Sequence, residues 1–187
     1  MSDVSRALSY AQLKSALWSR SGARVHAVID GLAVPGLPAK LAAADVSGWD
    51  CLERGALSPT AAERAPYVVE LREGSPFTDW LLATATIAHP QWGVVIACTE
   101  ALLRVREWCR DLSTVVTPDG GRRAFRWFDP EVLQTLLPAL SPSQLDTVFR
   151  LDQSLVLPAA DAWTWHAMHE GVLATERRAL MASRAAP

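Results

Sequence analysis

The spacing of hydrophobic positions changes along this chain, and each spacing predicts a different type of element. In residues 5–20, apolar side chains recur at every third or fourth position, which indicates a first helix. Residues 24–29 and 67–71 are short apolar runs of the β type. Residues 92–98 are apolar almost without interruption, which is typical of a strand covered on both faces. Strands therefore alternate with helices through the first half of the chain.

Capping residues mark where several of the predicted helices begin. Ser75 and Asp129 are side-chain caps, and each is followed by a proline, Pro76 or Pro130, at the first helical position. The helix after the long apolar run is expected to begin at Thr99, which has the same capping chemistry. These signals predict three helices in the central part of the chain.

The second half of the chain carries the signals of antiparallel pairing. Residues 115–128 have a Pro-Asp-Gly-Gly sequence at their centre and predict a hairpin. Residues 154–157 and 163–168 are two further expected strands. From Glu170 onward the chain is rich in Ala, Leu, Glu and Arg, so we expect a C-terminal helix.

These elements define an α+β fold with a mixed sheet of about five to seven strands and packed helices. Strands separated by helices favour parallel pairing early, whereas the hairpin and the late strands favour antiparallel pairing. The expected organisation is an N-terminal helix over residues 1–23, an α/β core over 24–157, and a short C-terminal strand and helix over 158–187.

Composition narrows the functional classes. Hydrophobic residues make up 50% of the chain and charged residues 20%, which is the balance of a globular protein rather than a disordered one. The net charge of −2 gives no general attraction to nucleic acids or anionic membranes. Three cysteines without a CxxC spacing favour free thiols, and no signal-peptide pattern is present. We therefore expect a cytoplasmic protein that binds neither a membrane nor a nucleic acid.

Sequence motifs for catalysis are absent, so no catalytic residue, metal or cofactor is assigned. The chain has no GxSxG, Walker, GxGxxG or HExxH sequence. His166 and His169 fall on a predicted strand, which would point them to opposite faces and away from a shared metal. A small enzyme that uses His26 or His166 with nearby carboxylates remains an alternative hypothesis.

A basic cluster suggests a second alternative, a nucleic-acid-binding module. Aromatic residues are interleaved with these arginines, as in many such modules. Glu107 and Asp111 also lie among them, which favours ion pairs within the fold. The cluster comprises Arg104, Arg106, Arg110, Arg122, Arg123 and Arg126.

Two tryptophans near the C-terminus allow either of two interpretations. Trp163 and Trp165 should face the same way on one strand, as a ridge of the core or as a hydrophobic docking surface. Together with Arg177 and Leu180 of the expected C-terminal helix, they are the candidate partner-binding residues.

A segment from Asp119 to Leu133 carries a more specific signal. Its sequence, DGGRRAFRWFDPEVL, resembles the signature of a bacterial family known as domain of unknown function 4123. Further blocks of the family pattern occur in the expected order between about residues 24 and 157. They are Val-Ile-Asp-Gly at 28–31, Leu-Glu-Arg-Gly at 52–55, the run at 65–71, and Trp-Gly at 92–93.

The resemblance implies a chaperone or adaptor of type VI secretion. Such a protein binds a secreted effector in the bacterial cytoplasm and helps to load it onto the valine-glycine-repeat (VgrG) spike, without catalysis. The motif itself is expected to be chiefly structural, with Phe125 packed inward. The motif residues are Asp30, Gly31, Trp92, Gly93, Phe125, Arg126, Asp129 and Pro130.

The chain departs from the family pattern in two places and is shorter than several members. Glu131 stands where an arginine is frequent, and Arg104-Val105-Arg106 stands where the family has His-Leu-Arg. Several members continue into a larger C-terminal lobe that helps to choose cargo. We therefore expect the cargo surface of this chain to be reduced or differently placed.

Overall fold

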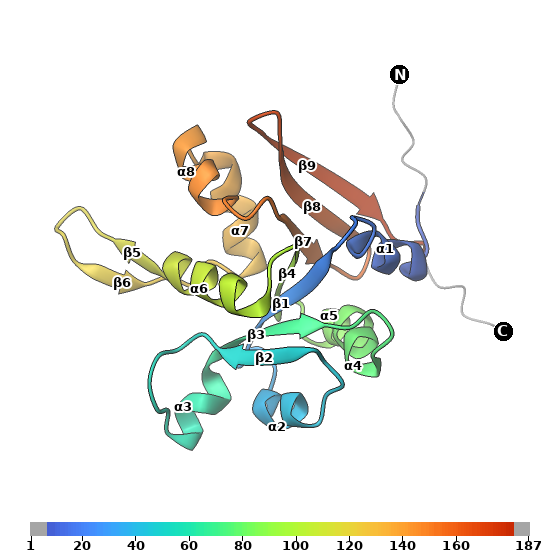
Figure 1. The fold of residues 1–187 in the computed structure, drawn as a ribbon, viewed down its shortest axis with the longest axis horizontal. Helices are drawn as coiled ribbons and strands as arrows, with labels where there is room; N and C mark the ends of the chain where they lie inside the picture. Colours follow the sequence, from blue (N-terminus) through green and yellow to red (C-terminus); the bar gives the residue numbers. More distant parts are fainter. Residues whose placement is uncertain (1–6, 182–187) are drawn as a thin grey trace.

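A computed structural model describes residues 7–181, and its centre is a seven-stranded sheet with helices on both faces (Figure 1). The strand order is β2-β3-β1-β4-β7-β8-β9, and a separate two-stranded hairpin, β5-β6, extends away from it. The fold class is α+β, as predicted. The strands are β1 (Arg24–Asp30), β2 (Gly48–Cys51), β3 (Pro66–Leu71), β4 (Gly93–Cys98), β5 (Thr114–Val116), β6 (Arg122–Ala124), β7 (Ser154–Pro158), β8 (Ala162–His169) and β9 (Val172–Ala179).

Most helices are short, and two of them begin at the predicted capping residues. The side chains of Ser75 and Asp129 cap their helices by accepting hydrogen bonds from backbone N–H groups of the first turn, and a proline occupies that turn, as expected. The helices are α1 (Tyr10–Leu17), α2 (Leu37–Ala42), α3 (Pro59–Arg64), α4 (Pro76–Asp79), the π-helical η1 (Trp80–Ala85), α5 (Thr86–Ala88), α6 (Leu102–Leu112), α7 (Pro130–Leu136), the 3-10 turn η2 (Leu137–Ala139) and α8 (Pro142–Val148).

Every pair of neighbouring strands in the main sheet is antiparallel, so the expected parallel pairing is wrong. β1 lies between β3 and β4 and runs opposite to both. The helical segment from α4 to α5 therefore joins two strands of the same direction that β1 separates. Helices and strands do alternate in the first half of the chain, but β1 and β2, which α2 connects, are not neighbours in the sheet, and neither are β3 and β4. β2 and β3, which α3 connects, are neighbours but antiparallel.

The central strands bury side chains on both faces of the sheet. On β1, Ala27 and Ile29 face a core formed with α1, α2 and η1. Val28 faces the opposite core, which is formed with α6, α7 and α8. β4 is likewise buried on both faces, as its continuous apolar sequence predicted. The two cores fix which helices lie on which side of the sheet.

The largest difference from the predicted elements is at the C-terminus. Residues 172–179 form strand β9 instead of a helix, and they pair with β8 along its whole length. Glu170 and Gly171 form the two-residue connection, with φ of 50° and 78°. Positive φ at both positions is the type I′ geometry that suits a twisted hairpin. Pairing with β8 thus overrides the helix propensity of this segment, and the end of the predicted helix, residues 182–184, lies outside the described residues.

Smaller corrections concern element ends. The first helix begins at Tyr10, after a capping box of Ser9 and Gln12, and the earliest residues of its predicted range lie outside the described part. The cap of α6 is Ala101 rather than Thr99. Strand β2 was not predicted, because its sequence, GWDC, is too short to show a periodicity.

The two ends of the described chain meet beside β9. The backbone N–H of Leu8 donates to Ala179 O at 2.8 Å, and Met181 N–H donates to Leu8 O at 2.8 Å. This parallel bridge covers one end of the outer edge of β9. Across residues 7–181, the helices are too short or too polar to cross a bilayer.

Candidate functional site

The motif residues converge where β1 ends and β4 begins. Asp30 ends β1, and its N–H donates to the carbonyl of Trp92 at 2.8 Å. The buried carboxylate of Asp30 accepts a hydrogen bond from Leu32 N–H at 2.9 Å and pairs with the guanidinium of Arg126. The same guanidinium lies over the Phe128 ring, 5.3 Å from its centroid. Arg126 therefore ties the segment before α7 to the centre of the sheet.

The two motif glycines allow backbones to approach closely. A Cβ on Gly93 would lie 1.8 Å from the carbonyl oxygen of Val28, and φ at Gly93 is +143°. A Cβ on Gly31 would lie 2.5 Å from the carbonyl oxygen of Ala65. Because both obstacles are backbone atoms, only glycine fits either position without moving a strand.

The remaining motif residues also stabilise the fold. Trp92 is buried and donates its indole N–H to Thr86 Oγ1 at 3.1 Å. The Asp129 carboxylate caps α7 by accepting from Glu131 N–H at 2.9 Å, and Pro130 occupies the first turn. Phe125 is half-buried and packs against the core beneath α6 and α7. The motif residues thus assemble one corner of the molecule.

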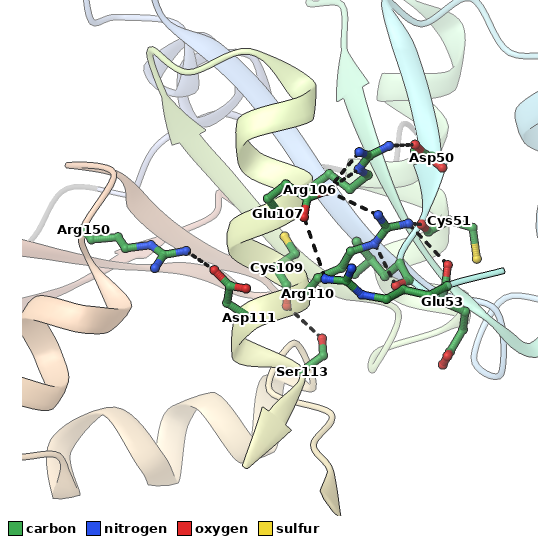
Figure 2. A network of polar contacts seen from close by, with 12 residues as sticks. Asp50, Cys51, Glu53, Arg106, Glu107, Cys109, Arg110, Asp111, Ser113 and Arg150 are labelled. Carbon is green, nitrogen blue, oxygen red and sulfur yellow. Dashed lines mark hydrogen bonds and ion pairs between the residues drawn. The ribbon is translucent and has the colours of Figure 1, made fainter. Parts of the chain in front are cut away.

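Polar contacts around α6 involve two arginines of the basic cluster, Arg106 and Arg110 (Figure 2). Arg106 pairs with Asp50 and with Glu107. Arg110 donates to the carbonyl oxygens of Cys51 at 2.8 Å and Leu52 at 3.1 Å. These contacts hold the loop after β2 against α6. The predicted use of the arginines as internal ion pairs is confirmed for Arg106, Arg110 and Arg126.

Arg122 and Arg123 differ from Arg106, Arg110 and Arg126, which form ion pairs within the fold. Both lie on β6 and are exposed, and no carboxylate of residues 7–181 forms an ion pair with either of them. They line a groove of about 450 Å³ between the hairpin and the loop after β2, which we call the arginine groove. Its lining consists of Leu52, Glu53, Arg54, Pro66, Arg110, Ser113, Thr114, Arg122, Arg123, Ala124, Phe125, Arg126 and Phe128.

A second groove lies on the other side of the hairpin and is predominantly apolar. It has a volume of about 550 Å³ and shares Thr114 and Phe125 with the arginine groove. Its walls are β5, α7, η2 and α8, with Leu133, Leu136 and Leu140 among its lining residues. The β5-β6 hairpin therefore separates two grooves of opposite chemical character.

The candidate histidines lie apart from both grooves. His26 is fully buried, with Nδ1 3.8 Å from Cys98 Sγ and Nε2 3.8 Å from a Glu70 carboxylate oxygen. Burial and then the nearby charge of Arg24 lower the pKa of His26 to about 4, and these effects outweigh the carboxylate because Arg24 also pairs with Glu70. His26 is therefore neutral at neutral pH.

His166 is also buried, and burial lowers its pKa. Its Nδ1 lies 3.0 Å from Thr175 Oγ1 on β9, and its Nε2 has no partner among the described residues. Across residues 7–181, His, Cys, Asp and Glu side chains form no group of three or more suited to a metal ion. Neither histidine lines the arginine groove or the apolar groove, so substrate access to either would require rearrangement.

The candidate partner-binding residues separate into buried and exposed positions. Trp163 and Trp165 stack with centroids 5.8 Å apart and are only 1% and 7% exposed. Of the two interpretations, the core ridge is therefore correct. The docking-surface interpretation is wrong, because α1 and Arg178 cover both rings. Arg177 is exposed and pairs with Asp161 at 2.5 Å, and Leu180 is half-buried against the core. Both lie on or next to β9 rather than on a helix.

The sequence identified Arg122 and Arg123 as basic residues but missed the groove that they line. Arg54 and Leu52 had been noticed only as a block of the family pattern. Their position opposite the hairpin depends on the contacts of Arg110 across many intervening residues. No local spacing could have shown this juxtaposition.

Comparison with known protein families supports the resemblance at the level of the family. Residues 25–147, well over half of the chain, match the family model described as domain of unknown function (DUF4123). The chain belongs to this family. No curated protein and no solved structure matches the chain significantly.

Proposed function

We propose that the protein is a non-enzymatic adaptor that binds a type VI secretion effector in the cytoplasm and helps to load it onto the VgrG spike. The proposal rests on the resemblance of the signature segment, residues 119–133, to that of type VI adaptors, and this segment lies within the family match at residues 25–147. The effector and the spike are the two expected protein partners.

One structural observation supports a binding role most directly. The motif anchors the base of an exposed hairpin, and an open groove lies on each side of that hairpin. Shallow grooves of this kind suit a polypeptide segment better than a small substrate that must be enclosed. The anchoring by Arg126 and Asp129 would keep the two grooves in a fixed relation to each other.

The enzymatic alternative has less support from the geometry. His26 and His166 are buried, and neither opens into the grooves beside the hairpin. A general base must be within reach of a substrate proton, directly or through a water molecule. The exposed arginines and apolar side chains are groups that bind rather than groups that transfer protons.

The experiment that tests the proposal is affinity capture of the tagged full-length protein from a lysate of its own cells. Recovery of a VgrG-type spike or a toxin, reproduced with the purified partner by size-exclusion chromatography, is the expected result. A folded protein that recovers neither would overturn the proposal. The comparison variant Arg177→Glu tests the exposed face of β9, and loss of the effector alone would place cargo recognition there.

A further inference from the structure

We propose that the arginine groove binds an acidic, extended segment of a partner protein, whose carboxylates pair with Arg122 and Arg123. This inference rests on the proposed function for the existence of a protein partner. It adds the place of binding and the chemistry of the bound segment.

The groove has an apolar floor, and hydrogen bonds attach both of its walls to α6. Phe128 and Leu52, which contribute to the floor, are 2% and 5% exposed. Arg110 fixes the wall after β2 through its bonds to the carbonyls of Cys51 and Leu52. On the opposite side, Phe125 N–H donates to Ser113 O at 2.9 Å and attaches the hairpin to α6. A groove held from both sides is organised before a ligand arrives, which reduces the entropy lost on binding.

The charge of the groove is strongly unbalanced. Five arginines line it, and Glu53 is the one acidic lining residue. Three of the arginines already have carboxylate partners. Arg126 pairs with Asp30, and Arg110 and Arg54 lie 3.3 and 3.8 Å from Glu107.

Arg122 and Arg123 remain without such a partner in residues 7–181. Guanidinium groups bind carboxylates through paired, charge-assisted hydrogen bonds. A segment with carboxylates at its rim-facing positions would therefore satisfy both arginines.

A protein segment fits this groove better than a nucleic acid. Single-stranded nucleic acids require exposed aromatic rings on which bases can stack. The two aromatic residues that line the groove pack into the fold instead, since Phe128 is 2% exposed and Phe125 is half-buried against the core.

The test measures binding of a fluorescein-labelled, glutamate-rich peptide with a central Leu-Phe pair to the full-length protein by fluorescence anisotropy. We expect Arg123→Glu to weaken binding at least about tenfold, because it replaces an attraction by a repulsion. We also expect affinity to fall as salt concentration rises. The same peptide with glutamine at every glutamate position should bind much more weakly.

A matched variant controls for net charge. Arg104→Glu changes the charge equally on an exposed position of α6 that does not line the groove, and it should leave binding within about twofold of wild type. Circular dichroism of both variants establishes that they are folded. Equal weakening by the two variants would overturn the inference, as would tighter binding of a labelled single-stranded oligonucleotide than of the peptide.

The same variants separate this inference from the proposed function. If the wild-type protein captures a spike or toxin but does not bind the acidic peptide, the groove inference fails and the adaptor function stands. If the peptide binds through Arg123 while no secretion partner is captured, the adaptor function fails and the groove chemistry stands. Loss of both peptide binding and partner capture in Arg123→Glu supports the two together.

Discussion

Gly93 shows how a single backbone atom can determine a residue type. We expect Gly93→Ala to lower the free energy of unfolding by at least about 3 kcal/mol, because the new Cβ would collide with the Val28 carbonyl and φ is +143°. Urea unfolding monitored by tryptophan fluorescence measures the loss. Gly22→Ala is the control, since φ is also positive there but nothing lies within 4 Å of its Cβ. The control should cost only about 1 kcal/mol, and equal losses would contradict this account.

His26 makes the stability of the protein depend on pH. The pKa of His26 is about 4 in the folded state and 6.5 for a solvated histidine, so the unfolded chain binds more protons between these values. The contribution of neutral His26 is therefore complete above about pH 6.5 and is lost as pH falls toward 4. The shift corresponds to a loss of about 3 kcal/mol.

Comparison with His26→Gln isolates this contribution from that of the carboxylates. Urea unfolding of both proteins at several pH values between 4 and 7 gives the difference in their free energies of unfolding. We expect the wild type to lose more stability than the variant as pH falls, because only the wild type must keep a histidine uncharged at this position. Parallel pH profiles would show that His26 is protonated alike in the folded and unfolded chains.

At the scale of elements, the sequence predicted those strands, caps and turns that are determined by residues close together in the chain. The buried strands β1, β3 and β4 and the caps at Ser75 and Asp129 were correct. The β5-β6 hairpin was also correct, but it ends at Ala124 and not at residue 128. The order of strands was not predictable, because it depends on contacts between distant segments. β2 was missed because four residues carry too little pattern, and it becomes a strand only through its pairing with β3.

The β8-β9 connection supplies a test at this scale. Glu170 has φ of 50°, a conformation that asparagine adopts more easily than glutamate, and Asn-Gly is a preferred type I′ pair. We expect Glu170→Asn to raise the free energy of unfolding by about 0.5 kcal/mol or more. Glu170→Gln removes the same charge without this preference and is the matched control. Stabilisation by both variants would point to charge rather than turn geometry.

The arginine groove illustrates what sequence reasoning could find of the candidate site. Composition and spacing drew attention to the basic cluster, and interleaved carboxylates correctly predicted that several arginines would be paired internally. Which arginines remain available depends on distant partners, such as Asp30 for Arg126. The sequence could not decide between the two interpretations of Trp163 and Trp165, because their burial depends on contacts with Tyr10 of α1 and Arg178 of β9.

At the scale of the whole molecule, β9 completes the sheet rather than adding an appendage. It covers Trp165 with the guanidinium of Arg178, 4.2 Å from the ring centroid, and bonds to the chain near Leu8. We expect a chain that ends at Met168 to be much less stable than the full-length protein, because β8 would lose its partner along eight residues. Thermal unfolding by circular dichroism tests this expectation. An unchanged midpoint would mean that β9 contributes nothing to the sheet.

The bridge between Leu8 and Leu180 also has a topological consequence. Since Leu8 bonds directly to Ala179 and Met181, a short linker from Met181 back to Leu8 could close the chain into a ring without stretching the sheet. New ends could then be opened at the exposed tip of the β5-β6 hairpin, where Gly120 has open space around it. Such a circular permutant would keep the strand order while changing the sequence in which strands emerge during synthesis. Folding of such a permutant would show that the fold does not depend on the order in which its strands are synthesised.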